Sequence, residues 1–452
     1  MKKITLFVTI LHFFVFLLPA QSSLNGLVSG PMLGAIQHRS AMIWLEVGNE
    51  VQSVELKYWE SANPTFVKSK FWMGELFLDF NPVKIELTDL KPNTQYEYAI
   101  TLDEQPVIFS YKTIFKTREL WEFRKPAPDF SFLTGSCAYL NEPEYDRPGK
   151  PYGNSPAIFG AMAKVSADFM LWLGDNTYLR EADYSSTYGI AYRYSHDRAA
   201  PDLAKFLAAM PHHAIWDDHD YGNNDADKTF PLKQVSRKKF IDYWCEQSYG
   251  EQNEGIYSKF THSDCEFFLL DNRWFRSNDE LPDSINGMLN ADKKMFGKAQ
   301  MDWLKNGILG SKAAFKFIVT GSQVLNPYSK YECLKQYPFE YQELMNFLDV
   351  TNPKGIVFLT GDRHHSEVIK LERKGKYPLY DITSSSLTAG VGFVKDEEKN
   401  NASRVPNTLL EANNFTKISI SGEKGKRKLT AEFLDIKGEK QKEFSVTEND
   451  LK

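Results

Sequence analysis

The chain has 452 residues, of which 42% are hydrophobic and 25% charged, as in ordinary globular proteins. Because this length exceeds what one hydrophobic core usually organises, we expect two domains. Its 54 basic and 59 acidic residues are scattered and give a net charge of -5, which excludes the concentrated positive surface of a nucleic-acid-binding protein.

The amino terminus has the order of a secretory signal. Met1-Lys2-Lys3 is followed by an apolar run from Ile4 to Leu18 and then by Pro19-Ala20-Gln21. The run is shorter than the ~20 apolar residues that span a bilayer. We therefore assign residues 1–20 to a signal peptide with an open cleavage point. We expect an exported protein, periplasmic or secreted, with no stable membrane insertion after the signal is removed.

Residues 24–118 are predicted to form a small all-β sandwich. Turn residues separate runs rich in Val, Ile, Thr and Tyr, which is typical of such domains. These runs are Ala41 to Val47, Ser53 to Trp59, Phe77 to Leu87 and Gln95 to Leu102. The turn from Leu90 to Thr94 resembles the same stretch of fibronectin-type domains. The charged segment 116–125, followed by Pro126-Ala127-Pro128, indicates a linker.

Residues 128–450 are predicted to form an α/β layered domain, because helical patterns there alternate with short apolar strands. Ser155-Pro156 marks one helix start. Three further helix-strand pairs are Leu203 to Met210 before Ala214 to Trp216, Gln300 to Leu309 before Phe317 to Val319, and Tyr341 to Leu348 before Ile356 to Leu359. Hairpins near residues 254–271 and after residue 415 predict that the sheets are mixed.

Six of these strands end in polar clusters. The clusters are Thr134 to Cys137, Gly174 to Tyr178, Asp217 to Asp220, Asp271 to Arg273, Thr320 to Gln323 and Thr360 to His365. Asp, Asn and Gly are common at strand ends simply as turn residues. Six such ends in one domain instead favour a shared site, because open α/β sheets bind ligands at the carboxyl ends of their strands. Their carboxylate, imidazole, amide and thiolate groups suit more than one cation.

The order of these motifs carries a resemblance to a known family. The motifs are Gly135-Ser136-Cys137, Gly174-Asp175 with Tyr178, Trp216 to Asp220 ending in Asn223-Asn224, and Thr360-Gly361-Asp362 with His364 and Ser366. Together they resemble the alkaline phosphatase D (PhoD-like) family of calcineurin-like metallophosphoesterases, over nearly the whole mature chain. The resemblance implies an α/β four-layer sandwich of two mixed sheets behind the β-sandwich, holding one Fe³⁺ and one or more Ca²⁺.

The resemblance also implies a ligand set. Cys137, Asp175, Tyr178 and His364 would bind Fe³⁺, and Asp175 would bridge to a Ca²⁺ that Asn223 and Asp362 complete. We choose Asn223, with Asn224 as the open alternative. The chain departs from the family at Leu179, where an acidic residue is frequent, and at Arg363, where a small apolar residue is frequent. These departures concern the substrate, and Arg363 is a candidate contact for a substrate anion.

The function hypothesis is hydrolysis of small phosphate monoesters by a metal-activated hydroxide. His219 or His365 would protonate the leaving oxygen. Arg273 or Arg276 would hold a phosphate oxygen, or else serve as a structural ion-pair partner. A phosphodiesterase or phospholipase D-like activity with the same metals is the alternative. An inactive cell-surface binding protein is the non-enzymatic alternative.

Three further expectations concern partners and side chains outside the ligand set. We expect a monomer that binds no nucleic acid. Cys245, Cys265 and Cys333 are expected to be buried thiols, although a Cys245–Cys265 disulfide is conceivable. The tyrosines between residues 139 and 194 either line a pocket or pack loops.

Overall fold

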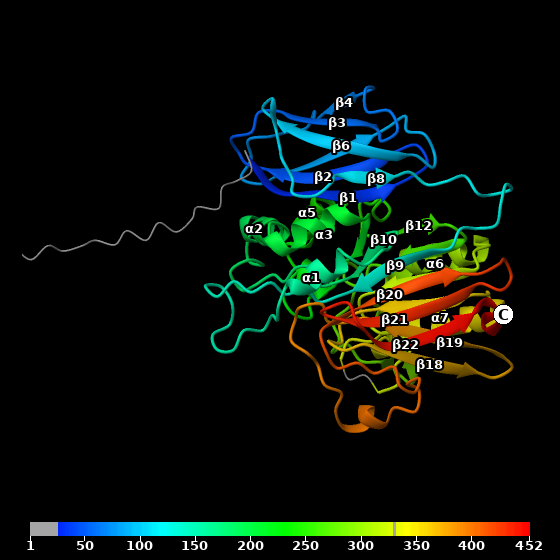
Figure 1. Cartoon of the computed structure of the whole chain (residues 1–452). Coiled ribbons are helices and arrows are strands. Elements are labelled where there is room, and N and C mark those ends of the chain that lie inside the picture. Colours follow the sequence, from blue (N-terminus) through cyan, green and yellow to red (C-terminus); the bar gives the residue numbers. More distant parts are fainter. Residues whose placement is uncertain (1–25, 329–330) are drawn as a thin grey trace, which may run out of the picture.

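The computed structural model describes residues 26–328 and 331–452, so the signal peptide assigned to residues 1–20 lies outside the described residues. The amino-terminal sheets and the layered domain that follows form two parts of the structure (Figure 1). Each part has a hydrophobic core, and the larger core, that of the layered domain, also includes Met32 and Trp44 of the amino-terminal sheets. No helix in the described ranges is long and apolar enough to cross a membrane.

The amino-terminal part consists of two sheets packed face to face. One has the order β1 (Leu27–Ile36), β2 (Ala41–Val47), β5 (Asn81–Leu87). The other has the order β4 (Lys68–Phe71), β3 (Val54–Glu60), β6 (Gln95–Leu102), β7 (Gln105–Pro106), with β8 (Ile114–Lys116) also pairing with β6. Alternate side chains of β3 and β5 are buried, as a half-covered sheet requires. The run predicted from Phe77 becomes a strand only at Asn81, because Phe77 has a φ of +65° that a strand does not accommodate.

The second part contains two six-stranded mixed sheets. The first has the order β11 (His212–Ile215), β10 (Phe169–Leu173), β9 (Phe130–Gly135), β20 (Asn414–Ser421), β21 (Lys428–Asp435), β22 (Lys440–Thr447). The second has the order β12 (Ser258–His262), β13 (Cys265–Leu269), β16 (Phe315–Thr320), β17 (Ile356–Thr360), β19 (Lys376–Thr383), β18 (Glu367–Arg373). A two-stranded ribbon, β14 (Ser284–Ile285) with β15 (Met288–Leu289), lies apart from both.

Helices cover the outer faces of both sheets (Figure 1). Those beside the first sheet are α1 (Ala157–Met162), α2 (Thr187–Arg198), α3 (Pro201–Ala209) and α5 (Lys233–Tyr243). Those beside the second are α6 (Gly297–Gly310) and α7 (Pro338–Thr351). The short helices are α4 (Asp218–Tyr221), η1 (Leu334–Gln336), η2 (Asp396–Asn400) and η3 (Glu448–Leu451). The four-layer α/β sandwich with an amino-terminal β-sandwich is therefore confirmed.

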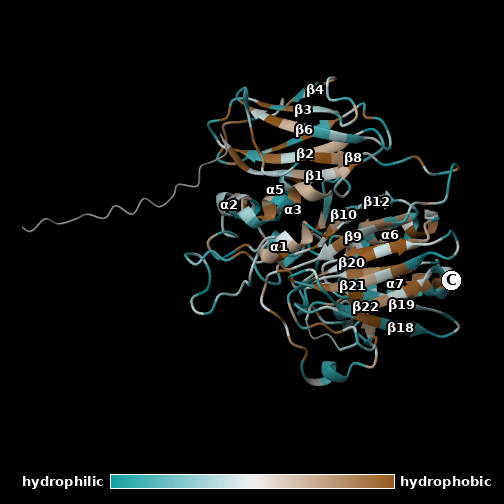
Figure 2. Ribbon diagram, viewed as in Figure 1, coloured by the Kyte–Doolittle hydropathy of each residue, from teal (hydrophilic) through white to brown (hydrophobic). Residues whose placement is uncertain are grey.

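Phenylalanine rings fill the space between the two large sheets. Phe132 of β9 meets Phe267 of β13 edge-on, with ring centroids 5.2 Å apart, and Phe317 of β16 at 5.6 Å. Phe169 of β10 adds a third edge-on contact with Phe267 at 5.4 Å. Hydrophobic residues accordingly concentrate in these strands (Figure 2). This rigid core fixes how the loops at the carboxyl ends of the strands lie relative to each other.

The β1-β2-β5 sheet rests on helices of the layered domain. Trp44 Nε1 donates to the carbonyl oxygen of Asp242 at 2.9 Å, and the Tyr243 hydroxyl donates to Glu46 Oε1 at 2.9 Å. The Arg198 guanidinium lies over the rings of Trp44 and Trp244, 5.4 and 4.1 Å from their centroids. The sandwich and the layered domain therefore share a buried interface.

All four cysteines of the chain are buried and free, so Cys245 and Cys265 do not form a disulfide. The expectation of buried thiols holds for Cys245, Cys265 and Cys333.

Candidate metal centre

The polar strand ends of both large sheets meet at one place. β9, β10 and β11 run parallel in the first sheet, and β13, β16 and β17 run parallel in the second. Their carboxyl ends converge, since Asn272 Nδ2 after β13 donates to Asp217 Oδ1 after β11 at 2.8 Å. Asp220 joins two neighbouring loops, because its Oδ1 accepts from Asn176 N and its Oδ2 from Asp217 N, both at 3.0 Å.

The backbone is strained at the candidate ligands. Cys137, Asp175, Asp362 and His364 have φ values of +61°, +52°, +65° and +57°. This left-handed conformation costs a residue other than glycine roughly 1–2 kcal/mol, and such strain clusters at functional sites. Four of the six predicted ligands thus have a backbone conformation that is unfavourable for residues other than glycine, and the loops hold them in it.

Cys137 lies at the bottom of the site. Its Sγ is 3.6 Å from Asp175 Oδ2 and 3.7 Å from the carbonyl oxygen of Asp362, and it accepts a hydrogen bond from Ser385 Oγ at 3.3 Å. The side chain is fully buried, and burial raises the pKa of the thiol to about 12. A cation that displaced the proton of this thiol would bind the resulting thiolate together with the nearby carboxylate of Asp175.

Three candidate ligands of different chemistry surround Cys137. The Tyr178 hydroxyl donates to Asp175 Oδ2 at 3.1 Å and lies 3.5 Å from His364 Nε2. Burial, together with Asp218 and Cys137, raises the pKa of Asp175 well above its ordinary value. Sulfur, carboxylate, phenol and imidazole therefore share one buried pocket.

His364 is held in the orientation that a metal ligand needs. Its Nδ1 lies 2.6 Å from the carbonyl oxygen of Gly390, so Nδ1 carries the proton and donates it there. The lone pair of Nε2 is then free to face the Tyr178 hydroxyl, 3.5 Å away. The backbone of His364 is held as well, because Gly392 N donates to the His364 carbonyl oxygen at 2.8 Å.

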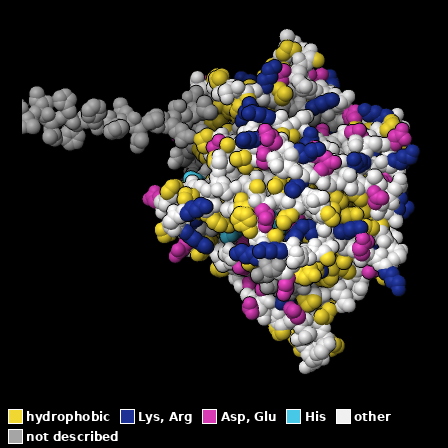
Figure 3. All heavy atoms as spheres, turned by 60° about the horizontal axis from the view of Figure 1, so that its bottom comes forward, with side chains coloured by type: hydrophobic (Ala, Val, Ile, Leu, Met, Phe, Trp, Pro, Cys, Tyr) yellow, Lys and Arg dark blue, Asp and Glu magenta, His cyan; other side chains and the backbone are white. Residues whose placement is uncertain are grey.

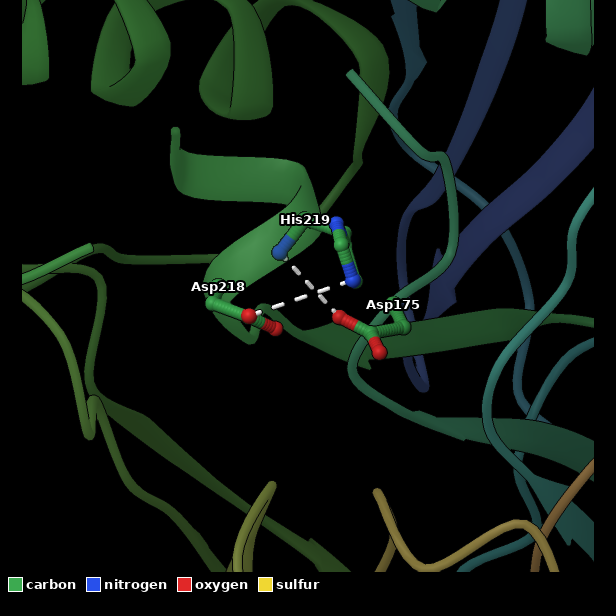
Figure 4. A group of neighbouring side chains, drawn as sticks. All are labelled: Asp175, Asp218 and His219. Atoms are coloured by element: carbon green, nitrogen blue, oxygen red, sulfur yellow. Dashed lines mark hydrogen bonds and ion pairs between the residues drawn. The ribbon is translucent and has the colours of Figure 1, made fainter. Parts of the chain in front are cut away.

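Asp175, Asp218 and His219 form a second group beside the first. Their ligand atoms lie within 4.8 Å of one another, and the side chains turn toward each other (Figure 4). His219 N donates to Asp175 Oδ1 at 3.2 Å, and His219 Nε2 is 3.9 Å from Asp218 Oδ2. Its ring stacks on Tyr178 with centroids 4.2 Å apart. Burial lowers the pKa of His219, so the imidazole is neutral at pH 7.

Arg273 lies beneath the acidic groups. It is fully buried, its Nε donates to Asp217 Oδ1 at 2.6 Å, and its Nη2 contacts Glu332. Arg276 is also buried, with Nη2 3.1 Å from Glu332 Oε1. Neither arginine lines the cavity above the site. Both side chains thus bind carboxylates of the protein.

The remaining predicted residues have other neighbours than the group around Cys137, although His365 lines the cavity above the site. Asn223 is exposed, its Nδ2 donates to the carbonyl oxygen of Asn224, and of the two asparagines Asn224 lines the cavity. His365 is buried, with Nε2 3.6 Å from Glu367 Oε1. The positions of Asn223, His365 and Arg273 do not test their roles, which stay predictions.

The structure adds acidic residues that the ligand prediction lacks. Two are Asp217 and Asp218, within the cluster after β11, and two are Asp225 and Glu332. Ligand atoms of Asp217, Glu332 and Asp362 lie within 4.8 Å of one another, as do those of Asp218, Asp225 and Glu332. Asp217 and Asp218 were visible in sequence as part of a strand end. Glu332 follows no strand and gave no such signal.

These donors fit cations. Burial raises the pKa of Asp217 to about 7 and that of Asp362 to about 8, and the negative charges of neighbouring carboxylates add to this rise. Within the described residues, the buried atoms Asp217 Oδ2 and His219 Nδ1 have no hydrogen-bond partner. Buried polar atoms without partners are costly. A thiol, a phenol, an imidazole and several carboxylates in one place offer both soft and hard ligands.

The fold is that of a metallophosphoesterase. The structure matches that of PhoD with a TM-score of 0.72 at 18% identity, over 94% of this chain and 89% of that one. It matches a purple acid phosphatase, PPD1 from yellow lupin, with a TM-score of 0.62 at 12% identity, over 92% of this chain and 74% of that one.

Residues 132–436 match the family model of PhoD-like phosphatases, and the chain belongs to this family. Residues 24–120 match a model described as a domain of unknown function, DUF7800. Alkaline phosphatase D of Bacillus subtilis (strain 168) is 25% identical in an alignment of 329 residues, and the match covers 63% of this chain. The match spans about half, 53%, of that protein. The family resemblance found in the sequence is thereby confirmed.

Proposed function

We propose that the protein is a metal-dependent phosphoesterase that hydrolyses small phosphate monoesters. The observation that carries this proposal is that Cys137 Sγ and the Tyr178 hydroxyl both contact Asp175 Oδ2, while His364 Nε2 lies 3.5 Å from the same hydroxyl. Membership of a phosphatase family supports the reaction class. A diester substrate with the same metals remains the alternative.

We assign two cation sites to this pocket. Cys137, Asp175, Tyr178 and His364 would hold Fe³⁺, to which thiolate and phenolate ligands are suited. Asp175 and Asp362 would hold Ca²⁺, a cation that takes oxygen ligands. The sequence predicts Asn223 as the amide ligand of Ca²⁺. Asn224 is the open alternative, and its position on the cavity wall supports this alternative.

When bound, such cations neutralise charge on phosphoryl oxygens and acidify a water molecule. The chain's own residues then orient the ester. His219 and His365 both line the cavity. We assign the transfer of a proton to the leaving oxygen to His219, because it is grouped with Asp175 and Asp218. Its neutral imidazole first takes this proton from the attacking water. Arg273 is assigned the structural role of holding Asp217 and Glu332, since its guanidinium is buried between them.

The remaining proposals concern location and domain bounds. Export to the periplasm or beyond rests on the sequence of residues 1–20 alone. The division into a sandwich at 24–118 and a catalytic domain at 128–450 is supported by the two separate hydrophobic cores.

The test is metal analysis together with hydrolysis of an aryl phosphate at alkaline pH, for wild type, Cys137→Ala and Cys245→Ala. Cys245 is an equally buried free thiol at the domain interface, so it controls for loss of a buried sulfur. We expect iron, calcium and activity in wild type and in Cys245→Ala, and loss of iron with reduced activity in Cys137→Ala. Unchanged iron in Cys137→Ala, or full activity without iron, would refute the ligand set. Iron that is absent and cannot be restored would favour the inactive binding protein.

A further inference from the structure

The cavity above the metal centre has aromatic walls. It measures about 690 Å³. Four aromatic residues that line it are unusually exposed: Tyr152 (46%), Tyr328 (39%), Tyr331 (66%) and Phe393 (63%). Ten aromatic residues are this exposed in the described part of the chain, and these are four of them. Exposed apolar side chains scattered singly need no explanation, but a group around one cavity indicates a binding surface.

Tyr152 and Phe393 line the cavity together with His364. The Tyr152 ring centroid is 5.9 Å from that of His364, and the Tyr152 hydroxyl is 3.4 Å from His364 Nδ1. Phe393 follows Gly392, whose position disfavours any side chain, because a Cβ there would lie 2.8 Å from the Arg363 carbonyl oxygen and 3.0 Å from His364 Cβ. Both rings therefore border the place where a phosphoryl group would meet the metal ligands.

The cavity lining around Arg363 is aromatic as well. The guanidinium of Arg363 lies over the ring of Tyr331, 5.4 Å from its centroid. The same guanidinium binds both carboxylate oxygens of Glu398, at 3.0 and 2.9 Å. Glu398 therefore neutralises the positive charge of Arg363, which is engaged within the protein.

Charge on the lining argues against a polyanionic substrate. Two lining residues are basic, Arg363 and Lys395. Eight are acidic: Asp175, Asp218, Asp225, Asp279, Glu332, Asp362, Glu397 and Glu398. Cations at the bottom would neutralise some of these acids but would leave the outer ones. On the face turned forward in Figure 3, basic and acidic side chains are interspersed around hydrophobic ones, without a large area of one charge.

We propose that the site takes phosphate esters whose leaving alcohol carries an aromatic ring and no further negative charge. Tyr152 and Phe393 hold this ring against the walls while the phosphoryl group faces His364 and Asp175. In the reaction the bond from phosphorus to the alcohol oxygen breaks and water oxygen bonds to phosphorus. The products are inorganic phosphate and the alcohol, which takes one proton of the water. This specificity rests on the proposed function.

The experiment compares two esters of primary alcohols, 2-phenylethyl phosphate and n-propyl phosphate, with the metal-loaded enzyme. Their leaving alcohols have similar acidity, so the ratio of kcat/KM reports contacts with the ring. One stacked aromatic pair raises that ratio roughly two- to tenfold, and two pairs raise it roughly tenfold or more. We expect a ratio near or above tenfold in wild type and a ratio of roughly three in Tyr152→Ala and in Phe393→Ala, since each variant keeps one of the two pairs.

Two variants separate the ring from other effects. Tyr152→Phe keeps the ring and removes the hydroxyl near His364, so the ratio should persist. Tyr145→Ala is the matched control, because Tyr145 is 43% exposed on the same connection, contacts Tyr192 and does not line the cavity. Its ratio should equal that of wild type.

The outcomes distinguish failure of this inference from failure of the proposed function. A wild-type ratio near one, or a ratio that survives in both alanine variants, overturns the inference. Equal rates for n-octyl and 2-phenylethyl phosphate show an apolar preference and overturn the aromatic one. Absence of all hydrolysis overturns the proposed function instead. In that case calorimetric binding still tests the ring: phenylphosphonate binding roughly tenfold tighter than methylphosphonate supports the inference, and equal binding refutes it.

Discussion

Replacing Arg273 with Gln removes a fully buried cation that contacts both Asp217 and Glu332. Removing one partner of a buried ion pair costs about 3–5 kcal/mol, because the other charge is left unpaired. Arg276 stays 3.1 Å from Glu332 Oε1, so the lower figure, about 3 kcal/mol, is expected. This loss makes the unfolded chain roughly a hundredfold more populated.

Urea unfolding of the metal-free protein measures this loss. Lys298→Gln is the control, since the Lys298–Asp302 pair is exposed, and its removal should cost less than about 0.5 kcal/mol. The loss in Arg273→Gln should also depend on pH. Burial already raises the pKa of Asp217 to about 7, and Arg273 opposes that rise. Without Arg273 the folded-state pKa rises further above the unfolded value, so the stability lost is greater at pH 8 than at pH 5.

The same variant decides between the two roles open to Arg273. A structural ion-pair partner predicts lower stability with little change in KM for an aryl phosphate at saturating metal. If stability were unchanged and KM rose tenfold or more, Arg273 would contact the substrate, and the ion-pair assignment would be wrong.

Three further predictions concern the core, the iron ligands and the carboxylates. Phe132→Ala should lower the free energy of unfolding in urea by about 3–5 kcal/mol, because the ring lies between both sheets. Phe123→Ala is the control and should lower it by almost nothing, because Phe123 is fully exposed; similar losses in both variants would contradict the packing. Tyr178→Phe keeps the ring but removes the hydroxyl bonded to Asp175; iron affinity should fall more than about tenfold by metal analysis, and full iron occupancy would exclude the phenol as a ligand. Burial raises the pKa of Asp362 to about 8 in the folded protein. A folded-state pKa above the unfolded value favours folding at low pH, so the free energy of unfolding of the metal-free protein should fall by at least about 1 kcal/mol between pH 5 and 9. A melting temperature that rises with pH would contradict this.

Much of the fold follows from local pattern. The predicted bounds of β2 and β6 match the structure because turn residues flank these runs of β-branched and aromatic residues. Helix α2 was not predicted, since its buried residues include Arg193 and Asp197, which pair with each other at 3.2 Å. A helix that buries ion pairs lacks the apolar period from which helices are found. Strand β22 was missed because, like many edge strands, it is rich in charge.

The site divides in the same way. Cys137, Asp175 and Asp362 were found because each follows a buried strand, and parallel strands bring their carboxyl ends together. Glu332 lies on a connection without strand signal and joins the site through two arginines more than fifty positions earlier. Asn223 and Asn224 differ only by the local turn, which decides which one faces the cavity. Contacts of this kind depend on the tertiary structure, and one sequence does not encode them locally.

The β1-β2-β5 sheet packs on α2, α3 and α5. The connection around Phe123 is therefore not the sole link between the two parts. A protease that cuts this exposed connection would leave two fragments still joined by Trp44, Glu46 and Arg198. Covalent linkage is thus needed chiefly during assembly, when it keeps the two parts at high effective concentration. In the finished molecule the interface, rather than the peptide chain, holds the sandwich in place.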